Sequence, residues 1–398
     1  MKKILSLDIK YSAIQVLYFG IYIALIGYAS VYLLAKGFSN SIIGIALAIS
    51  SAIAVFIQPT VATFADKNRH IELKKIVAGF IIVMAILSAS ILFLGDGTII
   101  LLCVFVGIAT LHSTLMPLLN SMAFVFEKYG IEINYGLGRG LGSATYALGS
   151  LALGYLVEDF GVNIFPIAYL AMNILLIFVV YNFVIPYNER KNLLKEEIQE
   201  EPKQLSFLSF CKRYKKFMIF VLGLILVYFT HIIINNFFIQ IITPIGGTET
   251  NMGIAVFIQA IMELPVMIFF NNIQKKFSCL TLIRFAVIMF IIKHILIYIS
   301  PNITMIYIAQ TLQMLSYAIL IPASVYYANQ IIEKSDSVKG QSMVTISIAA
   351  SGIIANLVGG VLLDVISVKQ VLLIGVGISI IGALIVITSV ENKKITND

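Results

Sequence analysis

The sequence predicts an all-α membrane protein with twelve transmembrane helices in two six-helix halves. Sixty per cent of the 398 residues are hydrophobic and only 12% are charged, whereas soluble domains carry about a quarter charged residues. The mean hydropathy is +0.98. An apolar helix needs roughly 20 residues to cross the ~30 Å hydrocarbon layer, so the chain has room for twelve spans and short loops. The solvent for most of the chain is therefore lipid.

Hydropathy divides the chain into six apolar runs on each side of one long polar stretch. We expect spans at 12–35, 41–64, 74–94, 98–126, 135–157, 163–185, 216–242, 250–271, 279–300, 302–331, 338–364 and 367–390. The polar stretch contains NERKNLLKEEIQEEPKQ, whose mixed charge is typical of a cytoplasmic connector. The predicted organisation is an N-terminal half at 1–187, a linker at 188–215 and a C-terminal half at 216–398.

The net charge of +7 is explained by membrane orientation, so we expect no nucleic-acid partner. With a cytoplasmic N-terminus, 23 of the 27 Lys and Arg residues fall on inside segments and only Lys36 and Lys369 on outside ones. Such an excess of positive charge marks the cytoplasmic face. We therefore predict a multi-pass protein of the cytoplasmic (inner) membrane, with both termini in the cytoplasm.

The sequence offers little for catalysis or metal binding. Cys103, Cys211 and Cys279 are too few and too scattered for a disulfide framework or a metal site. No nucleophile–His–acid grouping is evident either. We expect no enzymatic activity, no metal and no cofactor, with a proton as the candidate coupling ion.

Polar residues inside the predicted spans are the functional candidates, because an ionisable side chain at mid-depth costs about 2.5 kcal/mol or more. The ionisable candidates are His112, Arg139, His231, Glu263, Lys293 and His294. The amide candidates are Asn120, Asn235, Asn236, Gln240, Gln259, Gln310 and Gln313.

Glu263 lies near the middle of its span, in IQAIMELPVMIFF. Three interpretations are open: a static ion pair with Lys293 from the next span, an acceptor for substrate hydroxyls, and a proton carrier. These roles can overlap.

Arg139 lies in NYGLGRGLGSATYALGS, and Tyr146 follows it by two helical turns on the same side. An Arg beside an aromatic ring can hold a sugar or a base, although Tyr146 can equally serve packing. The surrounding glycines do not form a phosphate loop, because no strand precedes them. They favour close helix approach.

Three segments resemble lactose permease and its oligosaccharide/nucleoside–proton symporter relatives in the major facilitator superfamily. Residues 43–67, IGIALAISSAIAVFIQPTVATFADK, resemble the second span and the loop that follows it, with Asp66 in that loop. The pattern of Tyr135-Gly136, Arg139 and Gly142-Ser143 is similar to the fifth span, and Met-Glu-Leu-Pro at 262–265 is similar to the eighth. Lys293 falls where the family usually has an arginine.

The resemblance implies the major facilitator fold, with a substrate site near the midplane between two halves that alternate in access. It implies that Arg139 is a principal sugar ligand and that Tyr146 stacks on the sugar. It also implies that Glu263 binds sugar and couples the halves, and that Asp66 is a gating aspartate.

The tenth span departs from the family. Where lactose permease has Lys, His and Glu, this chain has Gln310, Gln313 and Ser316, and His231 replaces the Asp that pairs with the Lys. Asn120 stands where relatives often have an Asp. Both members of the charge pair are lost together, as expected because losing one would leave the other unpaired.

These departures predict a symporter or facilitator for a small neutral polar solute, most simply a sugar or a nucleoside. The candidate substrate-binding residues are Asn120, Arg139, Tyr146, His231, Asn235, Asn236, Glu263, Lys293, Gln310 and Gln313. Glu263 is the candidate for proton coupling. The alternatives are an efflux transporter for drugs or metabolites and a transport-inactive membrane sensor. We expect a monomer embedded in the bilayer.

Overall fold

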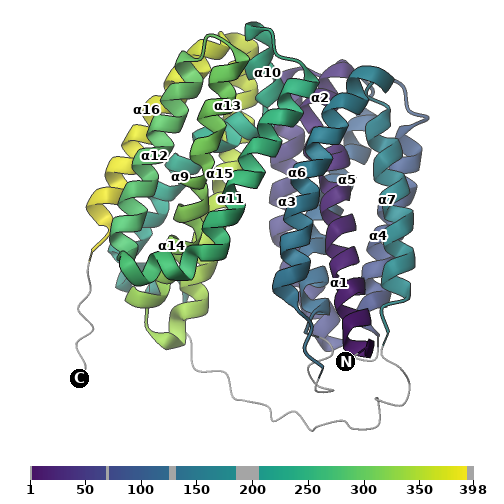
Figure 1. Cartoon of the computed structure of the whole chain (residues 1–398), viewed down its shortest axis with the longest axis horizontal. Helices are drawn as coiled ribbons and strands as arrows, with labels where there is room; N and C mark the ends of the chain where they lie inside the picture. The colour runs from purple at the N-terminus through teal and green to yellow at the C-terminus, as the bar shows by residue number, and fades with distance from the viewer. Residues whose placement is uncertain (1, 69–70, 125–130, 185–205, 392–398) are drawn as a thin grey trace. The chain divides into compact units, whose positions relative to one another are not determined.

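The computed structural model describes residues 2–68, 71–124, 131–184 and 206–391. Twelve of its helices are long and apolar enough to cross a membrane. The chain forms two compact units, Met1–Gln199 and Glu200–Asp398, each of which is a helical bundle (Figure 1). Most of the predicted linker lies outside the described residues, but its last part contains the short helix α8.

The N-terminal unit contains six spans. They are formed by α1 (Lys2–Ile21), a π-helical turn (Tyr22–Ile26) and α2 (Ala29–Ala35), then α3 (Asn40–Lys67), α4 (Leu73–Ile91), α5 (Ile99–Met122), α6 (Tyr135–Phe160) and α7 (Ile164–Tyr181).

The C-terminal unit begins with α8 (Phe207–Arg213) and also contains six spans. They are formed by α9 (Lys215–Asn236) with α10 (Phe238–Ile242), α11 (Glu249–Lys276), α12 (Cys279–Ile299), α13 (Ile303–Thr311) with a 3-10 turn (Leu312–Met314) and α14 (Tyr317–Ile331), α15 (Ser337–Val365) and α16 (Val368–Ser389).

Short polar loops start several of these helices with side-chain caps. Thr248 and Asn251 form a capping box at the start of α11, and Ser367 and Gln370 form another at the start of α16. Each box pairs backbone N–H groups that have no partner inside the helix. The loop sequences therefore determine where these spans begin.

The two units pack their spans in the same order. In the N-terminal unit, α1 packs on α6 and α7, α3 on α5, and α4 on α5 and α7. In the C-terminal unit, α9 packs on α15 and α16, α11 on α13 and α14, and α12 on α14 and α16. When the spans are numbered from 1 to 6 within each half, span 1 packs on spans 5 and 6, span 2 packs on span 4, and span 3 packs on spans 4 and 6. The fold is thus one six-helix arrangement used twice.

Three predicted spans are interrupted, whereas the hydropathy pattern predicted continuous helices. The first has a π-helical turn, the seventh breaks at Phe237 (φ −114°, ψ 34°), and the tenth passes through a 3-10 turn. In the tenth, the hydroxyl of Ser316 donates to the carbonyl of Leu312 at 2.8 Å. Interruptions are tolerated at membrane depth where other groups pair the freed backbone atoms, and average hydropathy does not detect them.

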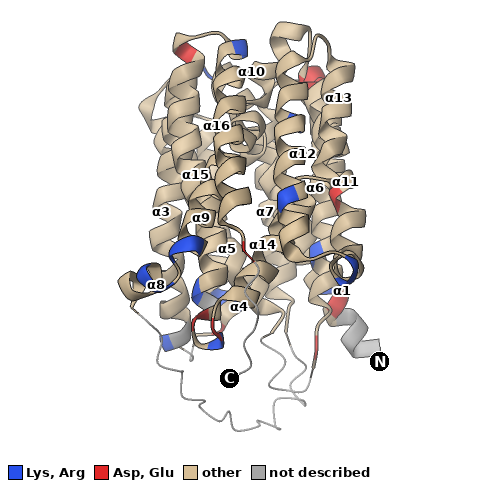
Figure 2. Ribbon diagram, turned by 90° about the vertical axis from the view of Figure 1, so that its left-hand side faces the viewer, with Lys and Arg blue, Asp and Glu red and all other residues tan. Residues whose placement is uncertain are grey.

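Basic residues gather at one end of each unit (Figure 2). In the N-terminal unit, Lys10, Lys67 and Lys74 lie near one end of the bundle, while Lys36 lies at the far end of the first span and pairs with Asp96 at 2.9 Å. The C-terminal unit repeats this asymmetry. Its first span begins with basic residues, α11 ends with them, and Lys369 lies at the opposite end.

Two glycines allow α9 and α16 to touch through their backbones. A Cβ atom added to Gly382 would lie 2.9 Å from the Gly223 carbonyl oxygen, and one added to Gly223 would lie 3.0 Å from the Gly382 oxygen. Small residues permit this close approach in membrane helices.

We predict that Gly382→Ala lowers the stability of the folded protein by about 1–3 kcal/mol, because backbone atoms must separate to admit the methyl group. Gly377→Ala on the same helix is the matched control, since a Cβ there has nothing within 4 Å. The measurement is the thermal unfolding midpoint in detergent. Equal midpoints for the two variants would contradict the close packing.

Candidate substrate-binding site

Arg139 is held on α6 beside the first span. Gly138 and Gly142 on either side of it face α1, where added Cβ atoms would lie 2.8 Å from the Tyr11 ring and 2.5 Å from the Phe19 ring. The close approach brings the guanidinium of Arg139 over the Phe19 ring, 4.4 Å from its centroid. Cation–π contact of this kind stabilises a partly buried charge.

The guanidinium of Arg139 makes one hydrogen bond among the described residues. Its Nη1 atom donates to the Ser143 hydroxyl at 3.1 Å, one turn along the helix. An arginine has five N–H donors in a planar fork. Arg139 therefore retains donors for an external partner.

Tyr146 joins an aromatic cluster in the N-terminal unit. Its ring centroid lies 5.9 Å from that of Tyr22, which lies 5.5 Å from the ring of His112. Tyr22 and Phe19 are both on the first span, so that span contacts both residues predicted on α6. The face of α6 that carries Arg139 and Tyr146 is therefore directed toward the first span.

Asn120 lies in the last turn of α5 and is linked to the first span through Gln15. The Gln15 amide donates to the Asn120 oxygen at 3.2 Å and to the Tyr11 hydroxyl at 2.7 Å. Gln15 is only 1% exposed and was missed by the sequence analysis. The sequence contained a signal for Gln15, because Gln15 is the one amide in the run YSAIQVLYF.

In the C-terminal unit, Gln313 joins Lys293 to Glu263. The Lys293 ammonium donates to the Gln313 side-chain oxygen at 2.5 Å, and the Gln313 amide nitrogen donates to the Glu263 carboxylate at 2.7 Å. Lys293 and Gln313 are both 0% exposed, while Glu263 is partly exposed. The amide has its oxygen toward the cation and its N–H toward the anion, so it bridges the two charges. We call these three residues the Lys–Gln–Glu bridge.

His231 and its neighbours form a second polar group in this unit. His231 Nε2 lies 3.0 Å from the Asn235 amide nitrogen, and its ring stacks on Tyr317 with centroids 5.0 Å apart. Asn236 instead donates to the side-chain oxygen of Asn356 on α15 at 2.7 Å. Asn356 is a further polar residue that the sequence analysis missed.

The other predicted residues lie apart from these groups. Gln310 is on α13 and is 1% exposed, and neither polar atom of its side chain has a hydrogen-bond partner among the described residues. Asp66 lies in the last turn of α3 rather than in the predicted loop, because the helix continues through Lys67. The side chain of Asp66 is outside the described part of the structure.

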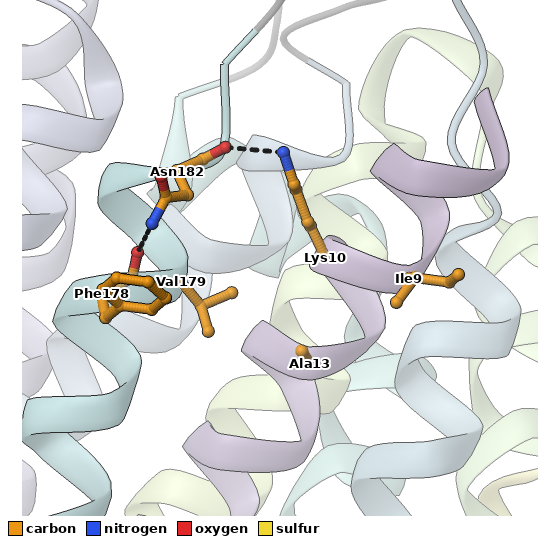
Figure 3. Close-up of a pocket in the computed structure, with 6 residues that line it drawn as sticks. All are labelled: Ile9, Lys10, Ala13, Phe178, Val179 and Asn182. Atoms are coloured by element: carbon orange, nitrogen blue, oxygen red, sulfur yellow. Dashed lines mark hydrogen bonds between the residues drawn. The ribbon is translucent and has the colours of Figure 1, made fainter. Parts of the chain in front are cut away.

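A pocket between α1 and α7 is lined by none of the predicted site residues (Figure 3). Ile9, Ala13, Phe178 and Val179 give it mainly apolar walls, together with Lys10 and Asn182. The Lys10 ammonium donates to the backbone oxygen of Asn182 at 3.0 Å. This contact joins the two helices near their ends and adds nothing to the candidate site.

Comparison with known proteins identifies the family. The MFS_1 like family matches residues 8–374. The chain belongs to the MFS_1 like family. It is therefore a multi-pass membrane transporter of small molecules and not an enzyme.

Individual proteins resemble this transporter over nearly its whole length. The maltose permease of Geobacillus stearothermophilus is 24% identical over 388 residues, which cover 93% of this chain and 91% of that one. A solved structure of the nucleoside transporter NupG matches 97% of this transporter and 100% of that chain, with a TM-score of 0.80 at 14% identity. A bacterial homologue of the human lysosomal transporter Spinster matches with a TM-score of 0.68 at 13% identity, over 97% of this chain and 96% of that one. The predicted major facilitator fold is confirmed.

We predict that the charges of the Lys–Gln–Glu bridge are energetically coupled. Glu263→Gln should destabilise the transporter by up to about 3–5 kcal/mol, because it leaves the fully buried Lys293 uncompensated. Lys293→Met should cost less, because the carboxylate that it leaves is partly exposed. The double variant should lose less than the sum of the single losses, with a coupling energy of about 1–3 kcal/mol. The coupling energy is measured from the unfolding midpoints, in detergent, of the wild type, the two single variants and the double variant. Additive losses of stability would mean that the charges act independently.

Proposed function

We propose that the protein is a secondary transporter, a symporter or facilitator, which moves a small neutral polar solute across the cytoplasmic membrane by alternating access. The observation that carries this proposal is the Lys–Gln–Glu bridge. Its cation and anion compensate each other, so the partly exposed Glu263 offers a hydrogen-bond acceptor within a set of three residues that has no net charge. Such a set suits a solute that is rich in hydroxyl or amide groups and is itself uncharged.

A sugar or a nucleoside fits the chemistry of both units. The free donors of Arg139 would bind hydroxyl oxygens, and the Tyr146–Tyr22 cluster offers aromatic surface to a ring. Glu263 would accept from solute hydroxyls, with Asn235 and Asn236 as further amide groups. The names of the maltose permease and of the nucleoside transporter NupG support the same two solute classes.

Binding at Glu263 would exchange one hydrogen bond for another. The Gln313 amide already donates to this carboxylate, so a solute hydroxyl would either share the acceptor or displace the amide. Hydrogen bonds to charged groups are worth about 1.5–3 kcal/mol, and displacement would therefore discriminate against solutes that lack a hydroxyl there. Glu263 is also our candidate for carrying a coupled proton. We further propose a monomer with both termini in the cytoplasm and Asp66 as a gating residue.

Arg139→Lys tests the proposed role of the guanidinium. Lysine keeps the charge but lacks the planar fork, so losing one charged hydrogen bond should reduce the kcat/KM of uptake by about 10–100-fold. The assay is uptake of labelled maltose and uridine into proteoliposomes, with cationic dyes as probes of efflux. Arg284→Lys is the matched control, because Arg284 donates to the backbone oxygen of Val390 outside the candidate site, and its uptake should equal wild type. Equal losses in both variants, or transport of dyes alone, would overturn the proposal.

The pH gradient tests coupling in the same vesicles. We predict that an imposed inward proton gradient drives solute accumulation by the wild-type protein. Glu263→Gln should abolish that accumulation, because the amide cannot release a proton. It should retain a slower solute equilibration, because its oxygen still accepts a hydrogen bond but carries no charge. Full gradient-driven accumulation by Glu263→Gln would remove Glu263 as the proton carrier, and indifference of the wild type would identify a facilitator.

A further inference from the structure

His112 occupies a closed aromatic cage in the N-terminal unit. It lies in the middle of α5 and is 1% exposed. Its ring is nearly parallel to that of Tyr18, with centroids 4.4 Å apart and an angle of 14°. Tyr22 at 5.5 Å and Tyr169 at 6.3 Å complete the cage. Three aromatic rings from the first span and α7 therefore surround one imidazole.

The imidazole of His112 has unused hydrogen-bonding capacity. Neither ring nitrogen has a partner among the described residues, and neither does the Tyr169 hydroxyl. Tyr18 donates instead to the backbone oxygen of His112 at 3.2 Å. A neutral imidazole carries one donor and one acceptor, and buried polar groups are paired in the great majority of cases. A phenylalanine would fill the same cage without the free-energy cost of burying unpaired polar atoms.

The cage lies next to both the interrupted helix and the candidate site. Tyr22 is the first residue of the π-helical turn Tyr22–Ile26, and such turns are frequent at functional sites. The same Tyr22 ring contacts Tyr146. The unpaired imidazole is thus one aromatic ring away from a residue already predicted to contact the solute.

The C-terminal unit contains a related pair. His231 on α9 stacks on Tyr317 of α14, and its Nδ1 atom has no partner among the described residues. Both pairs join the first and fourth spans of their unit, but His and Tyr have exchanged helices. Each unit therefore has an imidazole that stacks on a tyrosine and has a ring nitrogen without a partner among the described residues.

We propose that His112 is a substrate-binding residue of the N-terminal half, which donates to and accepts from adjacent polar groups of the solute. This inference rests on the proposed function. The solute class is a neutral molecule with neighbouring donor and acceptor groups, as in a vicinal diol or a nucleobase edge. The ring becomes reachable when the first span moves at its π-helical turn.

The test compares His112→Phe, which removes the polar ring atoms but keeps the aromatic volume, with His112→Gln, which keeps a donor and an acceptor. For His112→Phe, we expect a melting temperature of the solute-free protein equal to wild type or higher, and a Kd for the transported solute weakened by at least about 10-fold. His112→Gln, which retains a donor and an acceptor, should recover part of the affinity. Tyr32→Phe is the control, because the buried Tyr32 hydroxyl is also unpaired among the described residues but lies on α2, and its Kd should be unchanged.

Maltose, glucose and uridine serve as probes, by calorimetry on the detergent-solubilised full chain. An unchanged Kd in His112→Phe overturns the proposal, whatever its melting temperature. If the wild-type protein neither binds nor transports any probe, the proposed function fails. His112 is then judged on the solute-free protein, where a lower melting temperature of His112→Phe identifies a structural residue and overturns the inference.

Discussion

A polar group removed from water is costly unless it finds a partner within the chain, and this cost shapes the interior of the C-terminal unit. Its clearest expression is the fully buried ammonium of Lys293, which has only protein around it. An isolated charge in such a place is very unfavourable. The Gln313 amide relieves this by accepting from Lys293 and donating to Glu263. Three helical segments are thereby tied together by one neutral side chain.

The same constraint explains where the helices break. A break can free backbone groups, so it is tolerated only where those groups find partners. At the break in the tenth span, the Leu312 carbonyl accepts from the backbone N–H groups of Leu315 and Ser316 and also from the Ser316 hydroxyl. The broken segments carry Tyr22 on the first span, Asn236 on the seventh and Gln313 on the tenth. Interrupted helices and hydrogen-bonding side chains therefore coincide. The proposed alternating-access mechanism requires this combination, because residues that bind the solute must also move.

The sequence was sufficient for the fold, because apolar length and the distribution of basic residues are properties of whole segments. It also selected Lys293, Gln313 and Glu263 as candidates, because each is costly in lipid. It did not predict that the amide would lie between the two charges, since hydropathy gives the depth of a residue but not the direction of its side chain. Gln15 and Asn356 were missed for the same reason, being single amides in otherwise apolar runs.

Under the proposed function, the Gln313 amide on the tenth span changes what a solute must do to bind. An ion pair in a dry site holds its partners strongly, and a neutral solute competes poorly for either one. An amide between two charges makes two bonds of moderate strength, each of which a hydroxyl group can imitate as donor or acceptor. A polyhydroxylated solute could therefore replace Gln313 at Glu263 without leaving a charge unpaired, and a purely apolar solute could not. Under the proposed function, the bridge would favour one chemical class of solute, and Gln313 joins the two charges when no solute is bound.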